Sequence, residues 1–248
     1  MARRAYRSLH AMAARSSTPP RASTFTGFAD PSLRFFHELD AHQDREWFIA
    51  HKAEYEAQWA RPLAALLAQV SPAIARFYKG LPLREPKVFR IQRDVRFSMD
   101  KSPYKTHVSG LLALRGGSET LDAPAALYVQ LGTESFVGAG VYFMPPPLLK
   151  AWREALLDAR RGPALARLVD DLLARGYTAS AIDALKTAPR GVDPAHPRIA
   201  LLKQKGLALG FPPIPAGLIA TPGFADWLVE RAGETAPVVS KLARLLDG

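Results

Sequence analysis

The chain has 248 residues, of which 48% are hydrophobic and 23% are charged, and its formal net charge is +10. This length and balance are typical of a globular domain with a sizeable core, and the absence of cysteine excludes disulfides, a thiol nucleophile and cysteine-ligated zinc. No apolar run approaches the roughly 18 residues that a membrane-spanning helix needs, so we expect a soluble protein without a membrane partner.

Half of the net positive charge lies at the N-terminus. Residues 1–29 contain five arginines and no acidic residue. The Ser/Pro/Ala-rich composition predicts a disordered basic tail over residues 1–24 and a single domain over residues 25–248. A chain without cysteine fits a cytoplasmic location. An organelle transit peptide at residues 1–23 is the minor alternative, because such peptides are also rich in arginine and free of acids.

Helical periodicity begins near residue 30. Asp30 and Pro31 predict an N-cap followed by the first residue of a helix. Asp44 opens a second predicted helix that extends to residue 70, and Pro62 should kink or restart it.

Four strand-like runs follow, separated by short polar or glycine-rich breaks. They cover residues 87–97, 105–115, 125–132 and 136–144. Connections this short leave no room for crossover helices, so the runs predict an antiparallel meander. Within the fourth run, Gly138-Ala139-Gly140 indicates a bulge or a close approach of two backbones.

Helical patterns return after the fourth run. The sequence predicts helices at 145–161, 161–176, 197–203, 222–232 and 236–246, and a further strand at 206–211. The expected fold class is therefore α+β, with an antiparallel β-meander of four or more strands packed against N-terminal and C-terminal helices.

The segment FRIQRDVRFSMDKSPYKTH, residues 89–107, combines a strand pattern with dense charge. Strand alternation places the odd positions from 89 to 97 on an apolar face and leaves Arg90, Asp94 and Arg96 on a polar face. Arg93 is the exception on the apolar face. A buried guanidinium is costly, so Arg93 should have a carboxylate partner or be redirected by a bulge.

These cations predict a groove on the sheet that binds a phosphorylated or carboxylated small molecule. Asp94 would orient an arginine or act as acid and base, and His196 is the other catalytic candidate. The sequence indicates no metal site and no particular cofactor. The expected ligand-binding residues are Arg90, Arg93, Asp94, Arg96, Ser98, Asp100, Lys101, Tyr104, Lys105, Trp47 and Arg190.

Two other interpretations remain open. The net charge also suits a nucleic-acid-binding module, although no known nucleic-acid motif occurs. Alternatively, the charge row is an ion-pair ladder in a purely structural or interaction domain. Whether the protein is an enzyme, and its oligomeric state, are not decided by the sequence.

The same segment resembles the core motif of the domain-of-unknown-function 2461 family of bacterial and fungal proteins. The pattern Arg-x-x-Arg-Asp-x-Arg-Phe-Ser-x-Asp-Lys-x-Pro-Tyr-Lys is filled without a gap from Arg90 to Lys105. Residues 45–56, 136–156 and 185–209 are similar to further segments of that family. The resemblance implies a shared fold and a set of motif residues, and it implies no established activity.

Overall fold

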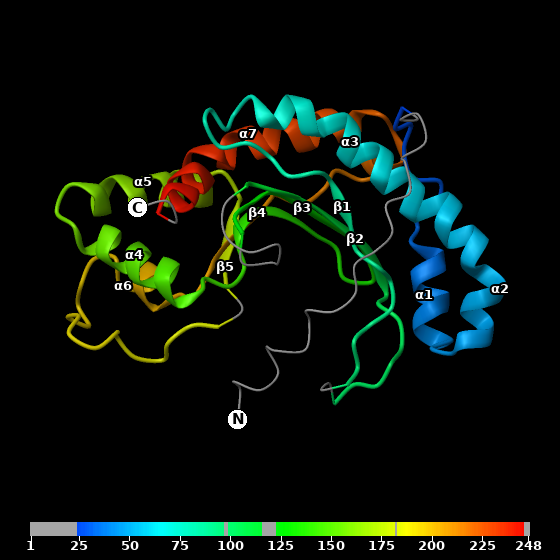
Figure 1. Cartoon of the computed structure of the whole chain (residues 1–248), viewed down its shortest axis with the longest axis horizontal. Coiled ribbons are helices and arrows are strands. Elements are labelled where there is room, and N and C mark those ends of the chain that lie inside the picture. The colour runs from blue at the N-terminus through cyan, green and yellow to red at the C-terminus, as the bar shows by residue number, and fades with distance from the viewer. Residues whose placement is uncertain (1–23, 97–98, 116–122, 182, 246–248) are drawn as a thin grey trace.

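The computed structural model describes residues 24–96, 99–115, 123–181 and 183–245 (Figure 1). The predicted basic tail lies outside these residues except for Thr24. The strands are β1 (Lys87–Val88), β2 (His107–Ala113), β3 (Ala125–Gly132), β4 (Phe136–Val141), β5 (Thr178–Ser180) and β6 (Leu207–Gly210). The helical elements are α1 (Arg34–Ala41), α2 (Arg45–Tyr55), a π-helical turn η2 (Glu56–Ala60), α3 (Arg61–Ala75), α4 (Pro146–Leu157), α5 (Arg161–Leu173), α6 (Ile199–Lys203), a 3-10 turn η3 (Leu218–Ala220) and α7 (Gly223–Arg244).

The strands form one antiparallel sheet in the order β1-β2-β3-β4-β6-β5. The first four are neighbours in chain order, which confirms the predicted meander and the α+β class. The strand expected near residues 206–211 is β6. The edge strand β5 was not predicted, because three residues are too few to show a period-two pattern.

Helices α3 and α7 cover one face of the sheet (Figure 1). Alternate residues of β2, including Val108 and Leu112, are fully buried against this layer. Between them, a Cβ on Gly110 would lie 2.5 Å from Leu67 Cδ1, so α3 packs directly onto the β2 backbone. This packing leaves the opposite side chains of the strands on the other face.

Helix α1 begins later than the sequence predicts. Residues 31–33 form a turn that ends at Leu33, whose φ of 60° is left-handed, and the helix starts at Arg34. Asp30 nevertheless caps it, because its carboxylate accepts hydrogen bonds from the backbone N–H groups of Arg34 (3.2 Å) and Phe35 (3.0 Å). The predicted cap was therefore correct and the predicted helix boundary was wrong.

Two prolines have different effects on the long helices. The disruption expected at Pro62 is present as the π-helical turn η2 immediately before α3. Pro237 does not divide the C-terminal segment, so the prediction of two helices there was wrong. Its neighbours Ala236 and Val238 are buried and Pro237 itself is exposed, so one continuous apolar face holds α7 together through the proline.

The strand predicted over residues 87–97 is also wrong, since β1 contains only two residues. The ladder continues to the bond from Phe89 N to Ser109 O and resumes at the bond from Lys105 N to Ile91 O, both 2.9 Å. The two-residue advance from Phe89 to Ile91 therefore lies opposite a four-residue advance from Lys105 to Ser109 on the partner segment. The ladder is irregular at this point. The segment 89–106 is here named the arm, and its described residues, 89–96 and 99–106, turn away from the sheet edge (Figure 1).

Candidate binding site on the open face of the sheet

The face of the sheet opposite α3 and α7 is concave, and no described helix packs across it (Figure 1). The arm lies beside the β1 edge, and α4 and α6 lie beside the β5 edge. A cavity of about 430 Å³ occupies this face and is lined by side chains of β2, β3, β4, β5 and β6. Its size is within the range of small-molecule sites. We name it the sheet cavity.

The floor of the sheet cavity consists of very small residues. Gly138, Gly140 and Ala208 lie side by side on β4 and β6. Gly140 has a φ of 111°, and a Cβ there would lie 2.1 Å from the carbonyl oxygen of Leu207. The close backbone approach expected at residues 138–140 is thus confirmed. A floor without side chains lets a flat group approach the backbone closely.

Three aromatic residues stand around this floor. Tyr128 and Phe136 have ring centroids 6.2 Å apart, and Tyr142 is 50% exposed beside them. Phe89 extends the row toward the arm, with its centroid 6.4 Å from that of Tyr128. Aromatic walls of this kind offer a large contact area together with hydroxyl groups at the rim.

A hydrogen-bonded chain of side chains crosses β2 and β3 at one end of the sheet cavity. The Tyr128 hydroxyl donates to Gln130 Oε1 (2.8 Å), and Gln130 Nε2 donates to the backbone oxygen of Glu134 (2.8 Å). Burial raises the pKa of Tyr128, and a hydrogen bond from the buried Ser109 opposes this shift. Tyr128 is therefore protonated at neutral pH and oriented by its neighbours.

Positive charge adjoins the sheet cavity on the β1 side. Lys87 Nζ and Lys105 Nζ lie 5.4 and 5.7 Å from the centroid of the Phe89 ring. Lys87 lies directly across the β1–β2 ladder from Leu111, and Leu111 lines the sheet cavity. Lys105 is half-buried and donates to the backbone oxygen of Arg90 (3.1 Å). Within the described part of the chain, no carboxylate forms an ion pair with Lys87, Arg90 or Lys105.

The half-buried groups near this charge titrate abnormally. Burial, followed by the positive charges of Arg90 and Arg93, lowers the pKa of Lys105. Burial and the neighbouring Lys105 and Arg93 lower the pKa of His107 to about 4, so its imidazole is neutral at physiological pH. Burial is the larger cause of both shifts, and the neighbouring positive charges add to it.

Two arginines and two aspartates of the arm are paired with one another. Arg93 pairs with Asp100, and Arg96 forms a two-pronged contact with Asp94 through Nε (2.8 Å) and Nη2 (2.6 Å). Arg93 has the expected carboxylate partner. However, its side chain is 31% exposed and that of Asp100 is 53% exposed, so the pair is not buried.

Hydrogen bonds account for the other polar groups of the arm. Bonds from Ser102, and then from Arg93, lower the pKa of Asp100 to about 2, and bonds from Arg96 lower that of Asp94 to about 2. Asp94 is consequently ionised at neutral pH. Lys101 Nζ donates to the backbone oxygen of Val95 (3.0 Å). Ser98 lies outside the described residues.

Two aromatic candidates contact or belong to α2 and do not line the sheet cavity. Tyr104 is buried against Phe48 of α2, and its backbone N–H donates to Gln43 Oε1 (3.1 Å). Trp47 stacks between His42 and His51, with centroid distances of 5.5 and 4.0 Å. Tyr104 therefore anchors the arm. Among the described residues, the ring contacts of Trp47 are with aromatic residues of the helical segment and not with the charged residues of the arm.

Arg190 and His196 lie in the loop between β5 and α6, beyond the other edge of the sheet from the arm (Figure 1). His196 Nδ1 accepts the backbone N–H of Arg198 (3.1 Å), which orders the start of α6. Arg190 is exposed. The structure thus separates these two residues from Arg90, Lys101 and Lys105.

Sequence reasoning missed the aromatic and polar side chains that line the sheet cavity. Tyr128 and Gln130 share a strand face by period-two alternation, which was a usable signal. The contribution of Phe136 and Tyr142 depends on how the strands are ordered and curved. In the part of the chain that the structure describes, no group of three or more metal-ligating side chains occurs. Nor does any described helix have the length and apolarity to cross a membrane.

Comparison with known proteins gives one result. The model of a family described as "Conserved hypothetical protein (DUF2461)" matches residues 31–240. No curated protein and no solved structure matches the chain. The match contains all the strands and the arm.

Proposed function

This chain belongs to the DUF2461 family, and we propose that it binds an anionic small molecule with a planar group in the sheet cavity. The observation that carries the proposal is the combination of a flat, small-residue floor with neighbouring lysines that form no ion pair with a carboxylate among the described residues. The anion is a phosphate or a carboxylate, as the charge pattern of the sequence also indicates.

The shape of the floor is the reason for proposing a planar group in the ligand. Gly138, Gly140 and Ala208 expose backbone and methyl surface, and Tyr128 and Tyr142 stand beside them. A flat ring can lay one face on this floor, with its edges against the aromatic side chains beside it. The Tyr142 side chain would bury additional apolar surface against such a ligand, because half of its surface is exposed in the free protein.

The balance of charges in the arm is the reason for proposing an anionic group in the ligand. In the arm, Asp94 and Asp100 are already used by Arg96 and Arg93. Lys105 is half-buried, and positive neighbours disfavour its charged form. An anion next to Lys105 would relieve this repulsion and form charge-assisted hydrogen bonds, which are stronger than neutral ones. Arg90 and Lys87 would complete the anion site.

The proposal is tested by the melting temperature and by calorimetric titration with matched ligands. The charged probes are adenosine monophosphate and nicotinate, and their uncharged counterparts are adenosine and nicotinamide. A charged probe at about 100 times its dissociation constant should stabilise the fold by about 2.7 kcal/mol. The uncharged counterparts should bind at least tenfold more weakly.

Three variants locate the site. Lys105→Gln should weaken the charged probes selectively, and Tyr142→Ala should weaken all planar probes. Lys241→Gln is the matched control, because Lys241 is exposed on α7, on the covered side of the sheet. Equal effects of Lys105→Gln and Lys241→Gln, or no preference for charged probes, would refute the proposal. Preferential binding of duplex DNA with a steep salt dependence would favour the nucleic-acid interpretation instead.

A further inference from the structure

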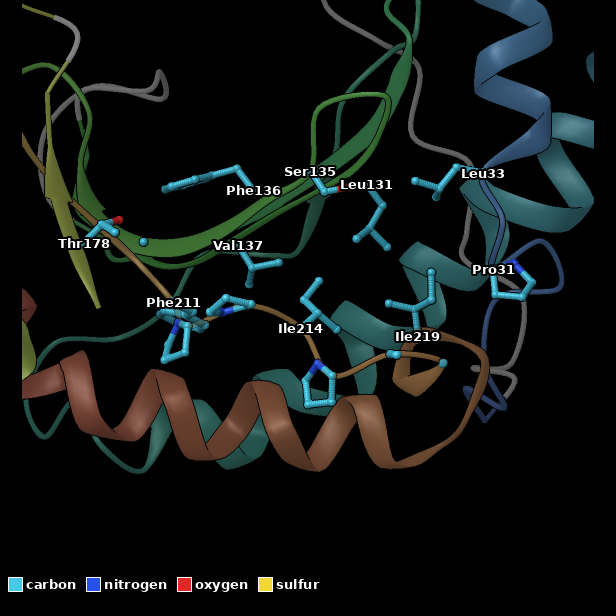
Figure 2. A pocket seen from close by; sticks show the side chains of 16 residues that line it. Pro31, Leu33, Leu131, Ser135, Phe136, Val137, Thr178, Phe211, Ile214 and Ile219 are labelled. Atoms are coloured by element: carbon cyan, nitrogen blue, oxygen red, sulfur yellow. The ribbon is translucent and has the colours of Figure 1, made fainter. Parts of the chain in front are cut away.

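We infer that the ligand also carries an apolar chain, which occupies a second cavity at the end of the same sheet (Figure 2). This inference rests on the proposed function. The second cavity, here named the end cavity, has a volume of about 380 Å³. It lies where the β3–β4 hairpin meets the proline-rich loop between β6 and α7.

Aliphatic side chains form the walls of the end cavity. Figure 2 shows Leu131 and Val137 of the hairpin facing Ile214 and Ile219 of the loop. Leu33, at the start of α1, closes another side. None of the residues that line this cavity is ionisable, although the whole chain is 23% charged. The end cavity therefore offers no partner for a charged group.

The backbone around the end cavity also offers few hydrogen-bond donors. Pro212, Pro213 and Pro215 have no N–H group. The Ser135 hydroxyl is used by the hairpin turn, because it accepts from Gly132 N (3.2 Å) and donates to Gly132 O (3.1 Å). A hydrogen-bond acceptor placed here would find few donors to replace its bonds to water. An apolar chain loses none and is the favoured occupant.

Phe136 connects the two cavities, because it lines both. Its ring lies over two glycines that face each other on β4 and β6. A Cβ on Gly138 would lie 2.8 Å from Phe136 Cζ, and a Cβ on Gly210 would lie 3.0 Å from Phe136 Cε2. The ring thus stands at the boundary between the floor of the sheet cavity and the end cavity. The aliphatic walls lie on the α7 side of the sheet, so a chain attached to a planar group on the floor would follow this ring around the ends of β4 and β6 to reach them.

The inferred ligand class is accordingly an amphiphilic anion with a charged group near Lys105, a planar centre over Gly140 and an apolar chain beside Ile214. A suitable probe series is phenyl phosphate with 4-methyl, 4-butyl and 4-hexyl substituents. Burial of one methylene contributes about 0.8 kcal/mol, which corresponds to about a fourfold gain in affinity. We expect calorimetric titration to show a gain that approaches this factor per methylene.

Two variants test where the chain binds. Ile214→Gln places an amide in the end cavity, and Ala216→Trp introduces a bulky side chain at an exposed position of its lining. Both should reduce the gain per methylene to less than about 1.5-fold. Ile49→Gln is the control, because Ile49 is 59% exposed on α2 and should retain the full gain. Circular dichroism verifies that each variant is folded.

The outcomes separate this inference from the proposed function. If phenyl phosphate binds and longer chains add nothing, the end cavity does not hold the ligand and the inference alone fails. If the gain survives in Ala216→Trp, the chain binds elsewhere and the inference again fails. If no member of the series binds, including phenyl phosphate, the proposed function itself fails.

Discussion

Tyr104 stacks on Phe48, with ring centroids 4.3 Å apart and ring planes inclined by 26°. This contact joins the arm to α2, across 56 positions of sequence, and both side chains are less than 7% exposed. It places the charged arm beside the open face of the sheet, although neither residue lines the sheet cavity or the end cavity.

The first prediction concerns this anchor. Tyr104→Ala should lower the free energy of unfolding by about 3–5 kcal/mol, because it leaves a cavity beside Phe48. Tyr104→Phe keeps the stacked ring and should cost less than about 1 kcal/mol. Urea denaturation measures both. Similar losses in the two variants would show that the hydroxyl, and not the ring, holds the arm.

The second prediction concerns the arm's ion pair between Arg93 and Asp100. Both side chains reach solvent, so the pair is screened and contributes little to folding. Arg93→Gln should change the melting temperature by less than about 2 °C. A loss of 8 °C or more would mean that Arg93 acts as a buried cation, as its place in the sequence pattern first indicates.

The third prediction concerns the floor of the sheet cavity. Gly140→Ala should destabilise the protein by more than the roughly 1–2 kcal/mol that a left-handed φ costs by itself, because the new Cβ would also meet the Leu207 carbonyl oxygen. Gly191→Ala is the matched control, since Gly191 has a φ of 80° and no atom within 4 Å of its Cβ position. Thermal unfolding should rank the control clearly above Gly140→Ala in stability. Equal losses would contradict the close approach of β4 and β6.

The fourth prediction concerns pH. The pKa of His107 is lowered to about 4 in the folded state, against about 6.5 in an unfolded chain. Between these values the unfolded state binds a proton that the folded state does not, so stability must fall as the pH drops from 6.5 to 4. His107→Gln should flatten this part of the stability profile relative to the wild type. Superimposable profiles for the two proteins would show that His107 is not shielded from protonation.

The fifth prediction concerns the domain boundary. We propose that residues 25–248 fold as a single domain, because residues 1–23 contain no apolar periodicity and no acid to pair with their arginines. Removal of residues 1–23 should leave the melting temperature unchanged within about 1 °C. A truncated protein that aggregates or melts several degrees lower would assign those residues to the fold.

Local patterns in the sequence determined much of the fold. Strand-like runs bounded by polar or glycine-rich breaks identified β2, β3, β4 and β6, and the short breaks between the first three led to the meander order. Caps and 3.6-residue periodicity located most helices within a few residues. These features depend on interactions between near neighbours in the chain, so they are visible in the residues themselves. The same reasoning identified the close backbone approach at Gly140 and a carboxylate partner for Arg93.

Only the tertiary structure decided where the charges and aromatic rings meet. The strand pattern of residues 89–97 is locally sound, but its register with the partner strand breaks between Phe89 and Ile91, and the polar row leaves the sheet. Sequence alternation cannot show this break, because it depends on hydrogen bonds to residues about 15 positions away. Tyr128, Phe136 and Tyr142 likewise converge only because the sheet is curved and its other face is covered by α3 and α7. The site is therefore a property of packing between distant segments, whereas the elements that build it are properties of the local sequence.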